Sequence, residues 1–209
     1  MTNNDWRALN GGLLLVCLCL PMLFRDLARW PWFGLVPLLV YAAVVSLIAP
    51  LRRSLKWLRF GRLDPTVLAV TAGIVLVCSG ALVAYYFLFQ PDLALVREHL
   101  PLGTGVILIL AGAGFSLLNA TIEEVVYLGI LLDALASQVS LSLAVMVQAA
   151  VFGMAHYQGY PPGPVGVVLA AIYGLVLGAL RQWAQGLAAP VVAHVFADAT
   201  IYAIVMNAT

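Results

Sequence analysis

Five ionisable side chains lie within strongly apolar stretches of the sequence, and they are the residues best suited to do chemistry. They are Glu123, Glu124, His156, His194 and Asp198. Between Arg97 and Arg181 there is no Lys or Arg that could pair with the two adjacent glutamates. Because an ionised carboxylate costs at least ~2.5–3.5 kcal/mol in hydrocarbon, acids in a membrane segment face a bundle interior or a wet cavity. The glutamate pair therefore predicts a functional site.

These residue types suit the hydrolysis of an amide bond without a Ser or Cys nucleophile. A carboxylate beside a water molecule can act as a general base, and a histidine can orient that water or carry its proton. A second histidine with a polar neighbour can donate hydrogen bonds to a developing oxyanion. The same groups could instead hold Zn²⁺ with an open position for water. We expect no cofactor, because the sequence lacks a His-Glu-x-x-His motif, and zinc remains the alternative.

The composition places these residues in a membrane protein. Of 209 residues, 64% are hydrophobic and 9% are charged, whereas soluble domains carry about 25% charged residues. The net charge of +1 gives no excess of basic residues for binding nucleic acid. Cys17, Cys19 and Cys78 lie in apolar runs without the spacing of a zinc site or a disulfide framework, so we expect them to be packing residues.

Seven segments are long enough to cross about 30 Å of hydrocarbon, which takes about 20 helical residues with ~17 as the lower limit. They cover residues 8–24, 33–50, 65–89, 102–135, 139–157, 163–181 and 187–206. The sequence therefore predicts an all-α integral membrane protein, a bundle of about seven transmembrane helices with a polar cavity inside the membrane. We expect the first segment to be a retained span, because it holds Pro21 and lacks the cleavage site of a signal peptide.

The basic residues predict the orientation, because positively charged loops stay in the cytoplasm. With a cytoplasmic N-terminus, three basic residues lie outside: Arg25, Arg29 and Arg97. Seven lie inside: Arg7, Arg52, Arg53, Lys56, Arg59, Arg62 and Arg181. The basic loop over residues 52–62 is explained by this topology signal, and contact with anionic lipid is a second interpretation.

Counting residues brings the polar side chains to similar depths. Glu123 precedes the turn near Gln138 by 15 residues and His156 follows it by 18, which places them about 22 and 27 Å from the turn. His194 lies about 14 Å beyond the next turn on the same side of the membrane. It reaches the depth of Glu123 and His156 if a helix is kinked or if the first hairpin protrudes into water. Asp198 shares the helix face of His194, because the two are four residues apart.

Three further features follow from position. Ala170, Gly174 and Gly178 form a small-residue face, which we expect to pack against a helix of the site, or to be a generic helix contact. Asp133 lies near the turn at Ser137 and is expected to be solvated. His99 lies beside charged residues and is expected at the surface.

Three motifs resemble those of the CPBP family, which comprises CAAX proteases and bacteriocin-processing enzymes and is also called the ABI family. They are Glu-Glu-Val-Val-Tyr-Leu-Gly over 123–129, Phe-Gly-Met-Ala-His over 152–156 and His-Val-Phe-Ala-Asp over 194–198. The resemblance covers residues 103–206. It implies a variable three-helix part over 1–100 and a four-helix catalytic core over 101–209.

The resemblance also implies roles for the five residues. Glu123 would be the base that activates water, Glu124 its support and His156 a second group that positions the water. His194 and Asp198 would form the oxyanion side, although Asp198 could instead orient His194, since an ionised carboxylate donates no hydrogen bond. The family's arginine four residues after the second glutamate is replaced here by Leu128. Glu124 is therefore expected to be protonated or paired with a distant group such as a histidine.

The implied function is that of an intramembrane endopeptidase acting on a membrane-anchored substrate. A CAAX-type tail, a leader peptide and a C-terminal sorting peptide are all candidate substrates. The expected location is the cytoplasmic membrane of a bacterium or archaeon. Leu128 keeps open a silent peptide-binding scaffold or immunity protein, and the buried acids keep open a proton or ion transporter, although no internal repeat supports the latter.

Overall fold

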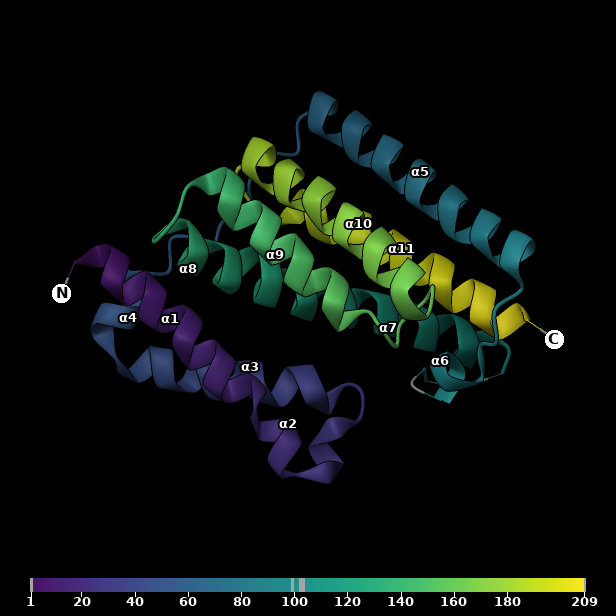
Figure 1. Ribbon diagram of the computed structural model, residues 1–209, viewed down its shortest axis with the longest axis horizontal. Coiled ribbons are helices and arrows are strands. Elements are labelled where there is room, and N and C mark those ends of the chain that lie inside the picture. Colours follow the sequence, from purple (N-terminus) through teal and green to yellow (C-terminus); the bar gives the residue numbers. More distant parts are fainter. Residues whose placement is uncertain (1, 99, 102–103, 209) are drawn as a thin grey trace.

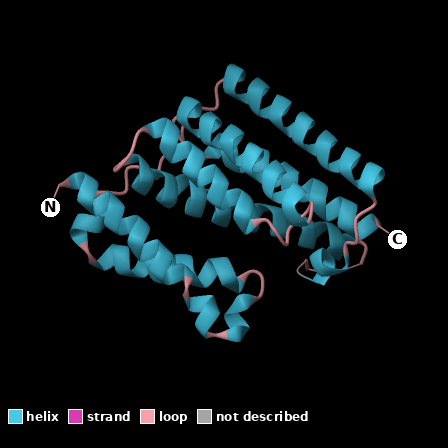
Figure 2. Ribbon diagram, viewed as in Figure 1, coloured by secondary structure: helices cyan, strands magenta, loops and turns pink. Residues whose placement is uncertain are grey.

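The computed structural model describes residues 2–98, 100–101 and 104–208, and His99 lies outside this part of the chain. Every regular element within these ranges is helical (Figure 2). The first half of the chain contains α1 (Asn3–Leu18), α2 (Leu20–Leu23), the 3-10 helix η1 (Arg25–Ala28), α3 (Trp32–Leu47), α4 (Ala49–Arg53), α5 (Pro65–Phe89) and α6 (Ala94–Glu98). The second half contains α7 (Val106–Glu123), the π-helix η2 (Glu124–Leu131), α8 (Leu132–Ala136), α9 (Leu141–Ala155), α10 (Gly163–Ala184) and α11 (Ala188–Asn207).

The prediction of an all-α membrane protein is confirmed. Five helical stretches in the described residues are long and apolar enough to cross a membrane: Asn3–Leu23, Pro65–Phe89, Val106–Ala136, Gly163–Ala184 and Ala188–Asn207. The segments predicted over 33–50 and 139–157 also form apolar helices, of 16 and 15 residues. Large apolar side chains are exposed on the surface of the bundle, including Leu47 at 85% and Leu76 at 74%. Such surface suits contact with lipid rather than water.

The helices that carry the candidate residues pack together as one group. In Figure 1, α9, α10 and α11 run side by side, α7 lies along α11, and α5 lies along the outer edge of this group. The principal helix contacts join α10 to α9, and α11 to both α5 and α7. Helices α1 and α3 form a separate pair, which meets the group where α1 packs against α8.

Glycines bring α9 and α10 into close contact. A Cβ atom added at Gly174 would lie 3.2 Å from the Cα atom of Ala149, and one at Gly178 would lie 3.0 Å from Val145. A Cβ atom at Gly153 would lie 2.5 Å from the backbone oxygen of Val167. The small-residue face of α10 therefore packs against α9, as we expected, and α9 ends beside His156.

Asp133 is buried, contrary to the prediction that water solvates it. Asp133 is 9% exposed, and both of its carboxylate oxygens accept hydrogen bonds from the Arg7 guanidinium, at 2.8 and 2.9 Å. The prediction considered only the nearby turn at Ser137. The packing of α1 against α8 supplies both the cover and the charge partner.

The basic loop reaches the start of α11. The backbone N–H groups of Leu187 and Ala188 donate to the carbonyl oxygens of Arg59 and Phe60, each at 3.0 Å. A Cβ atom at Gly186 would overlap the backbone nitrogen of Gly61, so only glycine fits at this contact. The loop between α4 and α5 is thereby fixed to the turn that precedes His194.

Candidate functional site

The first motif lies where an α-helix becomes a π-helix. Helix α7 ends at Glu123, and η2 begins at Glu124 and continues for eight residues. A π-helix pairs residue i with i+5 rather than i+4, and such segments occur frequently at functional sites. The register of the side chains therefore changes between the two glutamates.

Glu123 has one oxygen fixed and one oxygen free. Its Oε1 accepts a hydrogen bond of 3.0 Å from Nδ2 of Asn119, one turn earlier on α7. Its buried Oε2 has no hydrogen-bond partner and lies 3.4 Å from Nε2 of His156 and 3.8 Å from Nε2 of His194. The free oxygen thus faces both imidazole rings.

Glu124 is paired with a histidine from another helix. Glu124 is 1% exposed, and its Oε1 lies 2.7 Å from Nδ1 of His194 on α11. For an ionised Glu124, which can only accept, Nδ1 of His194 is the donor in this hydrogen bond. Of the two alternatives expected for Glu124, protonation or pairing with a distant group such as a histidine, the structure shows the pairing. Leu128, which occupies the arginine's position, is buried in the apolar core.

His156 is held at the end of α9 by its own backbone. Its Nδ1 lies 2.8 Å from the carbonyl oxygen of Phe152, and because a carbonyl only accepts, Nδ1 carries the proton. Nε2 is then directed at Glu123. The Phe152 ring packs against the imidazole with a centroid distance of 4.2 Å and lies edge-on to His194 at 5.8 Å.

Asp198 completes the group from the next turn of α11. Its Oδ1 lies 3.7 Å from Nε2 of His194, and its Oδ2 accepts a hydrogen bond of 3.2 Å from Nδ2 of Asn119. Asn119 therefore joins the carboxylates of Glu123 and Asp198. The residue is 5% exposed, so these charges are held in a site largely shielded from water.

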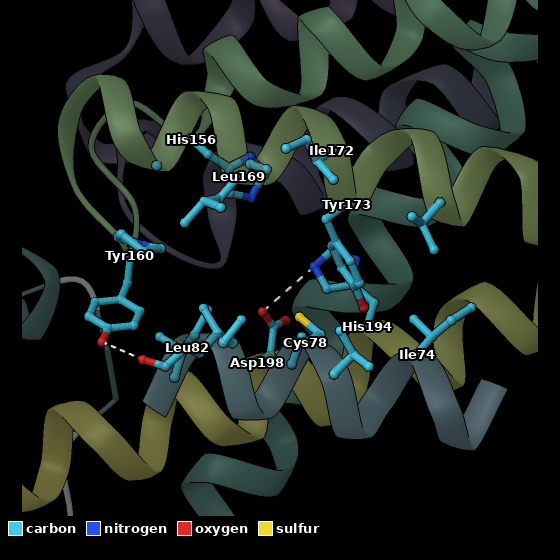
Figure 3. A pocket seen from close by; sticks show the side chains of 18 of the residues that line it. Ile74, Cys78, Leu82, His156, Tyr160, Leu169, Ile172, Tyr173, His194 and Asp198 are labelled. Atoms are coloured by element: carbon cyan, nitrogen blue, oxygen red, sulfur yellow. Dashed lines mark hydrogen bonds and ion pairs between the residues drawn. The ribbon is translucent and has the colours of Figure 1, made fainter. Parts of the chain in front are cut away.

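A cavity of about 500 Å³ opens onto three of the five residues, His156, His194 and Asp198, whereas Glu123 and Glu124 lie behind its wall. The cavity walls come mainly from α5, α9, α10 and α11 and are otherwise largely apolar (Figure 3). Cys78 of α5 lines the same space and was not predicted to do so. The hydroxyl of Tyr160 donates to the carbonyl oxygen of Leu82 across the cavity at 3.0 Å.

The donor types present are those that zinc uses, so the arrangement of the donors decides whether a metal fits. In the part of the chain that the structure describes, no group of three or more His, Cys, Asp or Glu side chains is arranged to hold a metal ion. Nδ1 of each histidine is already committed, to Phe152 and to Glu124. Histidines that bind a metal through Nε2 commonly donate Nδ1–H to a carbonyl or carboxylate, so these commitments do not decide the question. A reaction without metal therefore stays a prediction, and the reaction proposed for the site uses none.

All five residues predicted from the sequence meet in one site. The rise per helical residue predicted nearly equal depths for Glu123 and His156. In the structure, Oε2 of Glu123 lies 3.4 Å from Nε2 of His156. Their catalytic roles stay predictions. Sequence reasoning missed Asn119, although its position four residues before Glu123 places it on the same helix face. It also missed Tyr173 of α10, whose ring lies edge-on to His194 at 5.8 Å.

A site of paired acids and histidines beside an apolar intramembrane cavity defines a class, that of intramembrane hydrolases. Residues 105–200, which include all five candidate residues, match the family model described as Rce1-like, type II CAAX prenyl endopeptidase. This match supports the resemblance of the three motifs to those of the CPBP family. No curated protein and no solved structure shows significant similarity to it.

The pairing of Glu124 with His194 can be tested without an activity assay. A charge-assisted hydrogen bond of this length is short and strong, so the Nδ1 proton of His194 should resonate at low field in spectra of ¹⁵N-histidine-labelled protein. Glu124→Gln should move this signal upfield, because the acceptor loses its charge. The Nδ1 proton of His156, which bonds to a backbone carbonyl, serves as the internal control. Equal displacement of both signals, or of neither, would contradict the pairing.

Proposed function

We propose that this protein is an intramembrane endopeptidase in which Glu123 activates water. The observation that carries the proposal is the free Oε2 atom of Glu123, which faces the Nε2 atoms of His156 and His194. Asn119 holds the other carboxylate oxygen, so the free oxygen has a fixed direction. A carboxylate held in this way can take a proton from a water molecule.

The proposed reaction proceeds through a tetrahedral intermediate. Water attacks the carbonyl carbon of the scissile peptide bond while its proton passes to Oε2 of Glu123. His156 accepts a hydrogen bond from the water at Nε2, because its Nδ1 proton is committed to Phe152. The C–N bond then breaks, and Glu123 returns the proton to the leaving nitrogen. The products are an amine and a carboxylic acid, which then releases its proton to solvent.

His194 and Asp198 are proposed to form the side of the site that receives the oxyanion. Nδ1 of His194 is committed to Glu124, so Nε2 can donate to an oxyanion only when the ring is an imidazolium. Glu124, Glu123 and Asp198 surround the ring and can offset that charge. Asp198 is thus assigned to orienting His194, together with Asn119.

The cavity supports an apolar, membrane-anchored substrate. Its wall of aliphatic side chains from α5 and α10 matches a prenyl group or the aliphatic residues of a CAAX-type tail by the hydrophobic effect. We therefore propose a CAAX-type substrate whose apolar anchor occupies the cavity.

We also propose that the N-terminus lies in the cytoplasm, since seven of the ten Lys and Arg residues fall on that side. A tag at the N-terminus should then be cut by protease added to inside-out membrane vesicles. The same tag should be protected in right-side-out vesicles, and the reverse pattern would refute the orientation.

Glu123→Gln tests the general base. Turnover of a quenched fluorescent peptide ending in a farnesylated CAAX sequence should fall by about 10²–10⁴-fold in proteoliposomes, the range for loss of a positioned base. Glu98→Gln makes the same chemical change on the exposed end of α6 and should leave turnover as in the wild type. Undiminished cleavage by Glu123→Gln would exclude this residue as the base.

Removal of metal tests the cofactor assignment. Purified protein treated with 1,10-phenanthroline should cleave the same peptide at an unchanged rate and should contain no stoichiometric zinc. Loss of activity that added zinc restores would establish a metal-dependent reaction instead.

A further inference from the structure

The hydroxyl of Tyr173 is the feature of the site that the reaction above does not use. Tyr173 lies on α10, lines the cavity, and places its ring edge-on to His194 (Figure 3). Its hydroxyl oxygen is buried and has no hydrogen-bond partner. Buried polar groups in proteins are nearly always bonded, so an unpartnered one beside a candidate active site calls for an explanation.

The other described groups that line the cavity have their protons committed. Nδ1 of His156 donates to Phe152, Nδ1 of His194 donates to Glu124, and the hydroxyl of Tyr160 donates to Leu82. The thiol of Cys78 is only a weak donor. Tyr173 therefore supplies the strong neutral donor that remains available in this part of the cavity.

The proposed oxyanion side needs such a donor. Asp198 stands beside His194, but an ionised carboxylate accepts hydrogen bonds and donates none. Asn119 cannot replace it, because both protons of its amide are directed at Glu123 and Asp198. His194 alone would then stabilise the charge that develops on the carbonyl oxygen.

We propose that Tyr173 is a catalytic residue that donates its hydroxyl proton in a hydrogen bond to the oxyanion, in addition to the hydrogen bond from Nε2 of His194. The proton stays on the tyrosine throughout, so no bond to it forms or breaks. This inference rests on the proposed function. The donor contributes most when the carbonyl oxygen becomes negatively charged, so it acts on the transition state more than on the bound substrate.

Tyr173→Phe tests the role with the farnesylated peptide in proteoliposomes. The expected result is a fall in kcat of about 10²-fold, as for loss of one oxyanion-hole donor, with KM nearly unchanged. Tyr202→Phe is the matched control, because Tyr202 lies on α11, is absent from the cavity wall, and bonds through its hydroxyl to the carbonyl oxygen of Pro101. Its kcat should equal that of the wild type.

Two results would overturn the proposal. One is an unchanged kcat for Tyr173→Phe, and the other is a rise in KM at constant kcat, which would assign the ring to substrate binding alone. If the phenylalanine variant does not fold, 4-fluorophenylalanine at position 173 fills the volume of the hydroxyl without donating, and it should show the same loss of kcat.

The two proposals fail in different ways. If the wild type cleaves the peptide and Glu123→Gln does not, an active Tyr173→Phe variant refutes only the role of the tyrosine. If Glu123→Gln cleaves as well as the wild type, the proposed function itself is refuted.

Discussion

The buried hydrogen bond between Glu124 and His194 is the contact on which the rest of the site depends. It joins η2 to α11 across the bundle and is shielded from water, with 1% and 3% of the two residues exposed. Breaking a buried charged pair by removing one member leaves an uncompensated charge and typically costs about 3–5 kcal/mol. The bond sets which nitrogen of His194 is free, and so it sets which nitrogen can face Glu123 and Asp198.

Asn119 has a comparable effect on the acids. Three carboxylates within one small volume repel one another, and in a site of low dielectric this repulsion is stronger than in water. Asn119 donates to two of them, while His194 lies close to all three. Oε2 of Glu123 and Oε2 of Glu124 are buried without a hydrogen-bond partner. The two carboxylate oxygens of Glu123 therefore differ, one bonded and one free, because of the neighbouring residues.

Much of the fold and the convergence of the five residues could be predicted from the sequence. Long apolar segments fix the helices, and helical rise alone brings Glu123 and His156 to one depth. The π-helix could not be predicted, because its residues have ordinary helical hydrophobicity and the longer hydrogen-bond spacing depends on tertiary packing. The burial of Asp133 was missed for a similar reason, since its partner Arg7 lies 126 residues away in the sequence. Long-range pairs of this kind leave no local pattern.

The backbone contact between the basic loop and the turn before α11 gives the first half of the chain a part in the site. The backbone N–H groups of Leu187 and Ala188, where α11 begins, donate to the carbonyl oxygens of Arg59 and Phe60. The loop therefore defines where α11 begins and how the helix is rotated about its axis in the bundle. His194 and Asp198 follow within the first three turns of that helix. The loop between α4 and α5 therefore helps to position the helix that carries His194 and Asp198. The N-terminal and C-terminal halves of the chain cannot be exchanged independently between relatives unless this loop is transferred together with α11.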